Sequence, residues 1–417
     1  MPSKIPAIGA SNWGTELNTI FTDVTTSSDL SKPIPGTAYA GGGRAMIDPR
    51  AIAAADLTLY VSPSGTDPVA GVAVDFDMGL SLAKSFKTIK AVVEYACKFQ
   101  HQSYKITIKI SDGTYAMTTP VTINSSNYIS IEGNTALPQN VKLETDKTGF
   151  IIETPATILG MSFRCTQFFT STNVISFTAI FNYSTAVIQD CNIENYKYGI
   201  SSKGEMSIEN TINVKSCFVS VWSAFGGIIF MDCNFTSTLG KSNNFYAQGG
   251  KFYFYSGTYN ITDQGPSACC FGVDDGLIDI RGFQLFTRRG LLTNSTISNA
   301  AITINSQCFY YIYANYASQF FADPSVKHIV TCETFITATF QSLVSMFGVN
   351  PASSFNIKPN GILAQCYYNS YALVPAQGSM PNVATNTITV VGNSGVDKQG
   401  RAAVLNPSPS SGGFIVG

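Results

Sequence analysis

Charge is scarce in this sequence. Charged residues make up 12% of the 417-residue chain, roughly half of the share of about 25% that is usual in globular proteins. The 25 basic and 26 acidic side chains leave a net charge of −1, whereas a nucleic-acid-binding protein needs a surplus of lysine and arginine to neutralise phosphates. The composition therefore excludes a nucleic acid as the partner.

Long apolar runs and histidines are scarce as well. Although 45% of the residues are hydrophobic, no run approaches the roughly 20 residues that a membrane-spanning helix needs, so we expect no membrane span. The two histidines, His101 and His328, are too few for a histidine-based site, and we expect neither a metal nor a cofactor. The first ten residues hold two prolines and no continuous apolar segment, so they do not predict a secretory signal.

The ten cysteines are spread over the chain without any C-x-x-C pair. Most of them lie in apolar or Ser/Thr-rich stretches that read as strands. Because free cysteine is among the most buried residue types, we expect free thiols in the core rather than disulfides or a zinc site.

Residues 13–24 predict a short amphipathic helix near the N-terminus. Asn12 is a suitable N-cap, and apolar side chains recur at helical spacing: Trp13, Leu17, Ile20, Phe21 and Val24. A helix this short is marginal by itself, so it packs either on its own chain or on a neighbouring protein. Residues 27–56, rich in serine, proline, glycine and alanine, read as an extended linker or arm.

Small residues or cysteines followed by apolar side chains recur through the strand-rich region that comes later: Gly133, Gly160, Cys191, Cys217, Cys233, Gly257, Gly282, Cys308 and Cys332. Six of the eight steps lie between 24 and 27 residues, which suits a solenoid coil of three short strands. The step of 16 from Cys217 to Cys233 does not fit. We predict an all-β fold, a right-handed parallel β-helix, rather than an antiparallel sandwich, which needs closely spaced hairpin turns.

This pattern divides the chain into four parts. An N-terminal helix and arm is followed by an opening strand with an amphipathic helix across about 85–100, and then by the β-helix. Further strands and an extended tail come last, because the repeat of the coils is not recognisable in the sequence after about 345. The boundaries that we expect are 1–56, 57–104, 105–345 and 346–417.

Four sequence elements occur in order where the strands begin: Leu59–Asp67, Gly79–Ser81, Lys84–Val92 and Ile108–Tyr115. They resemble the opening of pectin-lyase-like right-handed β-helix domains, in which a strand, a Gly-Asp loop, an F-x-T-I helix and a strand ending in G-x-Y lead into the first coil. The resemblance covers about residues 57–135, and it implies that the helix at 85–100 caps the solenoid.

A shorter resemblance concerns the N-terminus. Residues 6–9 and 11–18, which contain a Trp-Gly-x-x-Leu-Asn stretch, are similar to the extreme N-termini of tail fibre and tail spike proteins of tailed bacteriophages. This resemblance implies a homotrimeric virion protein, assembled in the host cytoplasm, that contacts other tail or baseplate proteins and a host-cell glycan. It also implies that the N-terminal helix attaches the protein to the virion through Trp13, Leu17, Ile20 and Phe21.

β-Helix tail spikes often cleave polysaccharide with paired carboxylates, which glycosidic cleavage requires at about 5–10 Å from each other. The best local cluster is Asp274, Asp275 and Asp279, beside Arg281. The Asp-Asp pair is similar to that of polygalacturonase-type hydrolases, but neither histidine lies in the Gly-His-Gly motif of that family. Because residues 272–276 also have the composition of a turn, both readings stay open, and we favour the turn.

Tyrosines gather late in the chain, and five of them are candidates for an interface or a receptor-binding surface: Tyr253, Tyr255, Tyr310, Tyr311 and Tyr313. A tyrosine ring joins an apolar face to a hydroxyl, which suits a sugar or a protein neighbour. We expect packing between subunits, with ordinary core and receptor binding as alternatives. The chain as a whole predicts a non-enzymatic structural subunit of a phage tail; a polysaccharide depolymerase and a non-cleaving sugar-binding adhesin are the alternatives.

Overall fold

The computed structural model describes most of the chain from residue 56 onward. The helix expected over 13–24 and nearly all of the arm that follows it lie outside the described residues, and so does most of the tail expected after residue 406. The described residues are 56–69, 77–98, 105–167, 177–262, 264–265, 267–281, 302–322, 326–346, 353–374, 387–391, 394–397, 404–407 and 414–416.

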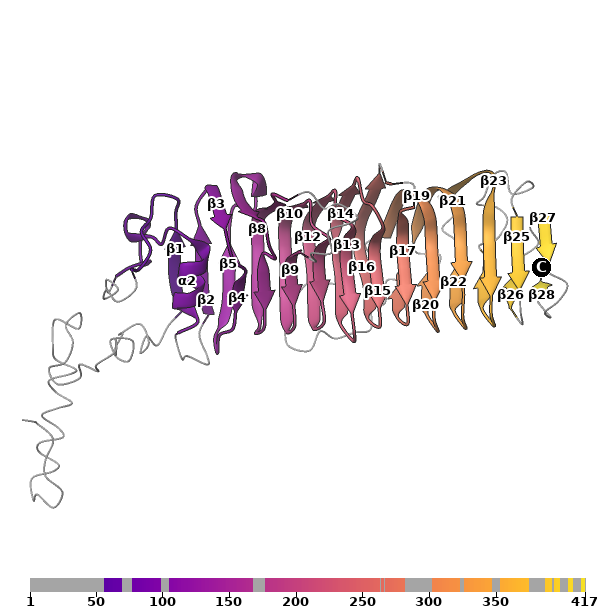
Figure 1. Ribbon diagram of the computed structural model, residues 1–417, viewed down its shortest axis with the longest axis horizontal. Coiled ribbons are helices and arrows are strands. Elements are labelled where there is room, and N and C mark those ends of the chain that lie inside the picture. The colour runs from indigo at the N-terminus through magenta and orange to yellow at the C-terminus, as the bar shows by residue number, and fades with distance from the viewer. Residues whose placement is uncertain are drawn as a thin grey trace, which may run out of the picture.

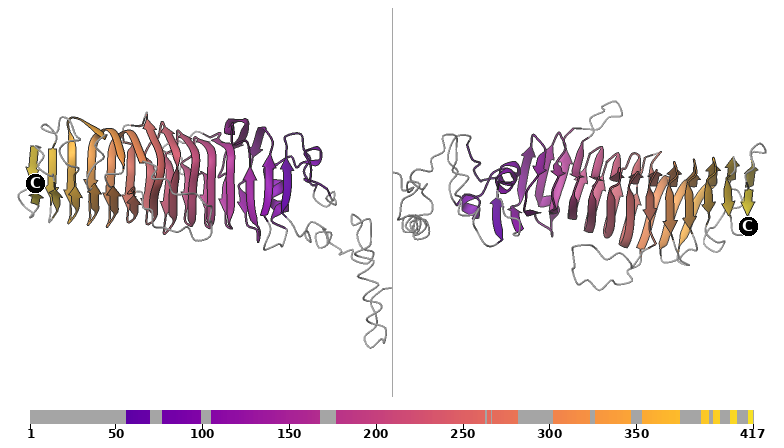
Figure 2. Two further views of the ribbon diagram at one scale, coloured as in Figure 1. Left: turned by 180° about the vertical axis from the view of Figure 1, so that it is seen from behind. Right: turned by 90° about the horizontal axis from the view of Figure 1, so that it is seen from below.

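The strands stack into one parallel β-solenoid, as the repeat predicted (Figure 1). Each coil contributes to three faces, and a strand on one face pairs with its equivalents in the coils before and after it. Figure 2 shows the same rod from behind and from below, with neighbouring coils side by side along its length. Apolar side chains from all three faces fill the interior as one continuous core.

The first face runs the whole length of the rod. It comprises β1 (Leu57–Val61), β2 (Lys105–Ile110), β5 (Tyr128–Glu132), the first halves of β8 (Ala156–Cys165), β10 (Thr185–Glu194), β12 (Glu205–Lys215), β14 (Ile228–Thr238) and β16 (Lys251–Thr262), then β18 (Leu277–Asp279), β20 (Gln319–Ala322), β22 (Leu343–Met346), β24 (Tyr371–Leu373), β26 (Gly395–Asp397) and β28 (Phe414–Val416).

The second and third faces share long strands with their neighbours. The second face comprises β3 (Gly113–Met117), β6 (Val141–Thr145), the second halves of β8 to β16, and the first halves of β19 (Ile302–Asn315), β21 (Lys327–Ala338) and β23 (Ser354–Tyr367). The third face comprises β4 (Val121–Ile123), β7 (Phe150–Ile152), β9 (Thr178–Asn182), β11 (Tyr198–Ser202), β13 (Val219–Ala224), β15 (Asn243–Gln248), β17 (Cys269–Asp274), the second halves of β19, β21 and β23, and then β25 (Thr387–Val391) and β27 (Val404–Pro407).

The register of the coils explains the step that did not fit the repeat. Cys233 in β14 pairs with Asn210 in β12, so Asn210 occupies the equivalent position in the preceding coil. Cys217 instead lies in the turn between β12 and β13. Counting Cys217 as a repeat position was therefore wrong, and β12 and β14 pair in continuous register, with Ile208 beside Met231.

The N-terminal end of the described rod carries the expected helix, shorter than predicted. Helix α2 (Ile89–Ala96) begins after Thr88, whose side chain accepts a hydrogen bond of 3.2 Å from the Ala91 N–H. Its apolar face is buried against β1, β2 and β4, which is the position of a cap on the first coil. Two short 3₁₀ helices, η3 (Leu82–Lys84) and η4 (Pro138–Asn140), complete the helical structure that is described. No helix in this part of the chain is long and apolar enough to span a bilayer.

The parallel ladder does not end at residue 345. Strand β23 pairs with β21, β25 with β23 and β27 with β25 on the third face, while β24, β26 and β28 continue the first. The expected division at 346 is therefore wrong, since the strands beyond it are further coils of the same solenoid.

All ten cysteines are free thiols, and eight of them are buried. All except Cys269 lie in the apolar core of the solenoid or pack against it, as expected for core thiols. Burial raises the pKa of the Cys191 and Cys366 thiols to about 12, so these sulfur atoms remain protonated at neutral pH.

A stack of aromatic rings marks the edge where the third face turns into the first. Tyr316, Phe340 and Tyr368 occupy this turn in three successive coils, with ring centroids 5.0 and 4.7 Å apart and nearly parallel planes. All three have positive φ, between 49° and 56°, a conformation that disfavours side chains with a Cβ. Stacking of the rings offsets this strain.

We expect Phe340→Ala to lower the free energy of unfolding by about 1–3 kcal/mol, because it removes two ring contacts worth about 0.5–1.5 kcal/mol each while alanine keeps the strained backbone. Urea unfolding followed by circular dichroism measures the change. Leu239→Ala is the matched control, since Leu239 is exposed with a φ of 56° and makes no ring stack. Equal effects of the two substitutions would contradict a stabilising stack.

Candidate functional site

The late tyrosines divide among three locations. Tyr253 and Tyr255 lie against Phe230 on the first face, with ring centroids 5.8 Å away in both cases, whereas Tyr310 and Tyr313 lie on the third face, 5.9 Å apart. Tyr311 is fully buried in the core. Its assignment to an interface or receptor surface is therefore wrong, because the bend of β19 between two faces turns both Tyr311 and the next residue inward.

An outward-facing aromatic row crosses the third face. Trp222, Tyr246, Gly272 and Tyr313 occupy equivalent positions in β13, β15, β17 and β19. Trp222 is stacked on Tyr198, with ring centroids 4.4 Å apart, and Tyr313 is 38% exposed. The row therefore presents large rings along the rod, interrupted by one glycine.

Gly272 leaves room for the Tyr246 ring. A Cβ at position 272 would lie 3.1 Å from Cδ2 of Tyr246 and 2.6 Å from Oδ1 of Asn243. With no side chain there, the ring leans toward the next coil, and its hydroxyl donates a hydrogen bond of 3.3 Å to Oδ2 of Asp274. Any larger residue at 272 would displace Tyr246 and separate it from Asp274.

A polar row lies two residues further along the same strands. Gln248, Asp274 and Asn315 are in register on β15, β17 and β19, and all three side chains are partly exposed. Thr339 continues the row, since its hydroxyl hydrogen-bonds Oδ1 of Asn315 at 2.5 Å. An amide, a carboxylate and a second amide thus lie side by side, each with a different pattern of hydrogen-bond donors and acceptors.

Exposed side chains of the turns border the polar row on its other side. Phe225, Asp275 and Tyr316 lie in the turns that follow β13, β17 and β19, and Phe225 is 65% exposed. We call the central group the Tyr246 patch and define it by six residues: Trp222, Tyr246, Gln248, Asp274, Tyr313 and Asn315.

The tyrosine hydroxyls of the patch stay protonated at neutral pH. Burial is the main cause that raises the pKa of Tyr246, and the charge of Asp274 adds to it. Burial also raises the pKa of Tyr313, with further contributions from Tyr310, Cys269 and Asp274. Both hydroxyls can therefore donate hydrogen bonds over the whole physiological range.

The three candidate catalytic aspartates do not form one cluster. Asp274 ends β17 on the third face and Asp275 lies in the turn with a φ of 51°, as the composition of this segment predicted. Asp279 ends β18 on the first face and is buried. Arg281 donates to both of its oxygens, from Nε at 2.9 Å and Nη2 at 2.6 Å.

The sequence alone did not reveal Trp222, Tyr246, Gln248 or Asn315 as site residues. Their period-two alternation with buried neighbours is a signal that they face outward. This alternation within each strand could not show that Tyr246 and Tyr313 lie in one row. Residues 282–301 lie between them in the sequence and hide the register of the two coils.

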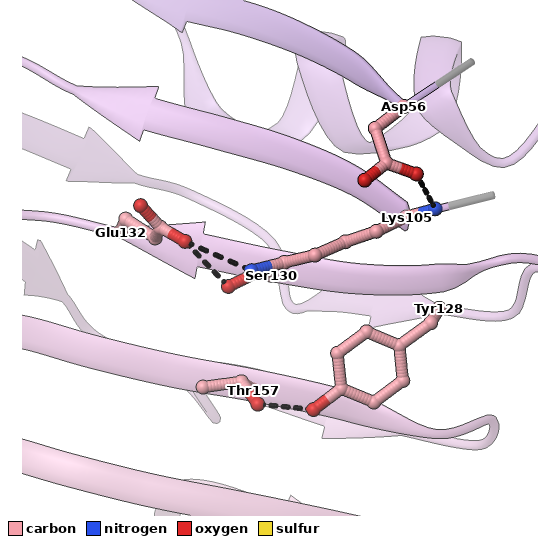
Figure 3. Close-up of polar contacts among 6 residues, drawn as sticks. All are labelled: Asp56, Lys105, Tyr128, Ser130, Glu132 and Thr157. Carbon is pink, nitrogen blue, oxygen red and sulfur yellow. Dashed lines mark hydrogen bonds and ion pairs between the residues drawn. The ribbon is translucent and has the colours of Figure 1, made fainter.

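A second polar group, near the start of the first face, satisfies its own hydrogen bonds (Figure 3). Glu132 accepts from Nζ of Lys105 at 3.3 Å and from the Ser130 hydroxyl at 2.9 Å, and the Tyr128 and Thr157 hydroxyls bond each other. The Lys105–Glu132 and Tyr128–Thr157 contacts join successive coils, so we assign them to holding the coils in register.

No protein-family model matches the chain, and no curated protein sequence is significantly similar to it.

Proposed function

We propose that the chain is a non-enzymatic structural subunit of a tailed-phage tail fibre or tail spike, and that its third face binds a polysaccharide of the host surface. The observation that carries this proposal is the polar row of Gln248, Asp274 and Asn315 between the aromatic row and the exposed turn residues. The virion assignment, the homotrimer and the attachment through Trp13, Leu17, Ile20 and Phe21 rest on the sequence resemblance.

The chemistry of the Tyr246 patch suits sugars. A pyranose ring has an apolar face of C–H groups and a rim of hydroxyls, so it needs flat apolar surface beside hydrogen-bonding groups. Tyr246 and Tyr313 supply both in one side chain, while Gln248 and Asn315 can donate and accept at once. Asp274 accepts only, which fixes the orientation of a hydroxyl that donates to it.

The geometry favours an extended chain rather than a single sugar. The rows follow the rod, and neighbouring strands lie roughly 4.8 Å apart. Tyr246 and Tyr313 are two coils apart, so roughly 10 Å separates their strands, a distance that two linked pyranose rings span. A polysaccharide lying along the rod would therefore contact both tyrosines at once.

We expect Tyr246→Ala and Tyr313→Ala each to weaken polysaccharide binding by about tenfold or more, because losing a contact of about 1.4 kcal/mol lowers affinity tenfold. Binding is measured on an array of purified bacterial capsular and lipopolysaccharide-derived polysaccharides. Tyr253→Ala is the matched control, since Tyr253 is a partly exposed, ring-stacked tyrosine on the first face. Equal losses in all three variants, or no binding by the unmodified protein, would contradict the proposal.

The same polysaccharides also test the non-enzymatic part of the proposal. Each one that binds is incubated with the protein, and new reducing ends and unsaturated products are measured. We expect neither. Cleavage that is abolished by Asp274→Asn or Asp275→Asn would instead support the depolymerase alternative.

A further inference from the structure

The centre of the third face carries negative charge only. In the strands and turns that contain the patch, residues 219–227, 243–250, 269–276 and 310–318, the charged residues are Asp274 and Asp275. Neither of them belongs to an ion pair among the described residues. A ligand on the patch therefore meets two carboxylates on adjacent residues.

The lysines nearest to these segments in the sequence are both exposed: Lys241 lies in the turn before β15, and Lys251 begins β16 on the first face. Nζ of Lys203 lies 5.3 to 5.8 Å from the ring centroids of Phe181, Tyr183 and Phe225, in a turn that belongs to an earlier coil. Lys197 lies 5.2 Å from the Tyr198 ring. Lys203 and Lys197 thus lie over aromatic rings, and Lys203 places its charge beside Phe225 at the border of the patch.

We infer that Asp274 determines the charge selectivity of this face, so that it accepts neutral or amino-bearing polysaccharides and rejects those that carry carboxylates. The inference rests on the proposed glycan binding and deepens it. A sugar carboxylate placed on the patch would lie beside Asp274 in surroundings partly shielded from water, where like charges repel more strongly than in bulk solvent. Selection by such repulsion excludes a wrong ligand without requiring a better fit to the right one.

Tyr246 and Gly272 hold the selective group in place. The hydrogen bond from the Tyr246 hydroxyl keeps Asp274 on the outward side of β17, and Gly272 leaves the space that the ring needs for this contact. Asp275 adds a second charge from the turn, but it is exposed, so solvent screens it more than Asp274.

The experiment compares one polymer in two charge states. The neutral polysaccharide that binds best on the array is oxidised at its primary alcohols, which converts some of its CH₂OH groups to carboxylates. Affinities of both forms are measured by biolayer interferometry for the unmodified protein, Asp274→Asn, and the control Asp190→Asn. Asp190 lies at the corner between the first and second faces, where its carboxylate accepts from Nδ2 of Asn210 at 3.0 Å.

We expect oxidation to weaken binding to the unmodified protein and to Asp190→Asn at least tenfold, and Asp274→Asn to recover most of that loss. The difference should shrink at 1 M salt, because screening shortens the range of the repulsion to about 3 Å. An equal loss in Asp274→Asn, or array hits that are mainly acidic polysaccharides, would overturn the inference and leave the proposed function standing. Binding to no polymer would overturn both.

Discussion

Gly257→Ala is expected to destabilise the solenoid more than an alanine at any other described glycine, because its Cβ would make the closest contact. Gly257 has a φ of +107°, and a Cβ built on it would lie 1.9 Å from the carbonyl oxygen of Cys233 in the preceding coil. The clash is between two backbones of one parallel ladder, so no side-chain rotation relieves it. Relief requires the coils to separate locally, which breaks hydrogen bonds between β14 and β16.

We expect this substitution to lower the free energy of unfolding by more than about 4 kcal/mol, in the range reserved for severe core or backbone disruption. Chemical unfolding and the yield of soluble protein measure the effect.

Gly226→Ala separates backbone strain from the clash. Gly226 also has a positive φ, +90°, but a Cβ there would meet nothing within 4 Å. Only the strain of a left-handed conformation is then added, about 1–3 kcal/mol. If Gly257→Ala were no worse than Gly226→Ala, close stacking at Cys233 would not be what requires the glycine.

Acid is expected to destabilise the late coils through His328. This histidine is buried in the core, where its Nδ1 contacts the Tyr311 hydroxyl at 2.5 Å and its ring stacks on Phe355 with centroids 5.6 Å apart. Burial lowers its pKa from the ordinary 6.5 to about 3. Between these two values the unfolded chain binds a proton on His328 and the folded chain does not.

Folding stability therefore falls as the pH drops from about 6.5 toward 3, and it is unaffected by this group above 6.5. With 1.36 kcal/mol for each unit of pKa difference, the contribution is on the order of 4–5 kcal/mol at the acid end.

The variant His328→Gln isolates the contribution of His328. The carboxylates are the same in the variant and the unmodified protein, so their effects on the pH dependence cancel in the comparison. We expect the variant to be less stable at pH 7, since it loses the ring stacking on Phe355. Its stability should fall less steeply with acid than that of the unmodified protein. The measurement is the free energy of unfolding at intervals from pH 7.5 to 3.5, and parallel curves would show that His328 does not cause the acid sensitivity.

Several features of the site could be predicted because they depend on residues close in the sequence. Asp275 lies in the turn that its Asp-Gly neighbourhood indicated, since turn chemistry is local. Tyr311 could not be placed in this way. It is followed by buried Ile312, so the bend of the strand interrupts the alternation on which an outward assignment depends.

What the sequence by itself determined is the class of fold: a recurrent coil of short strands with small residues at repeated positions, a capping helix within about 85–100, and thiols in the core. These follow from side-chain period and residue size, which are properties of each coil. Only the tertiary structure decided that Tyr246, Asp274 and Tyr313 share one surface and that Asp279 lies on another. The physical reason is that contacts along a solenoid are set by the register between coils, and the turns of unequal length between its strands change that register without changing the pattern within any strand.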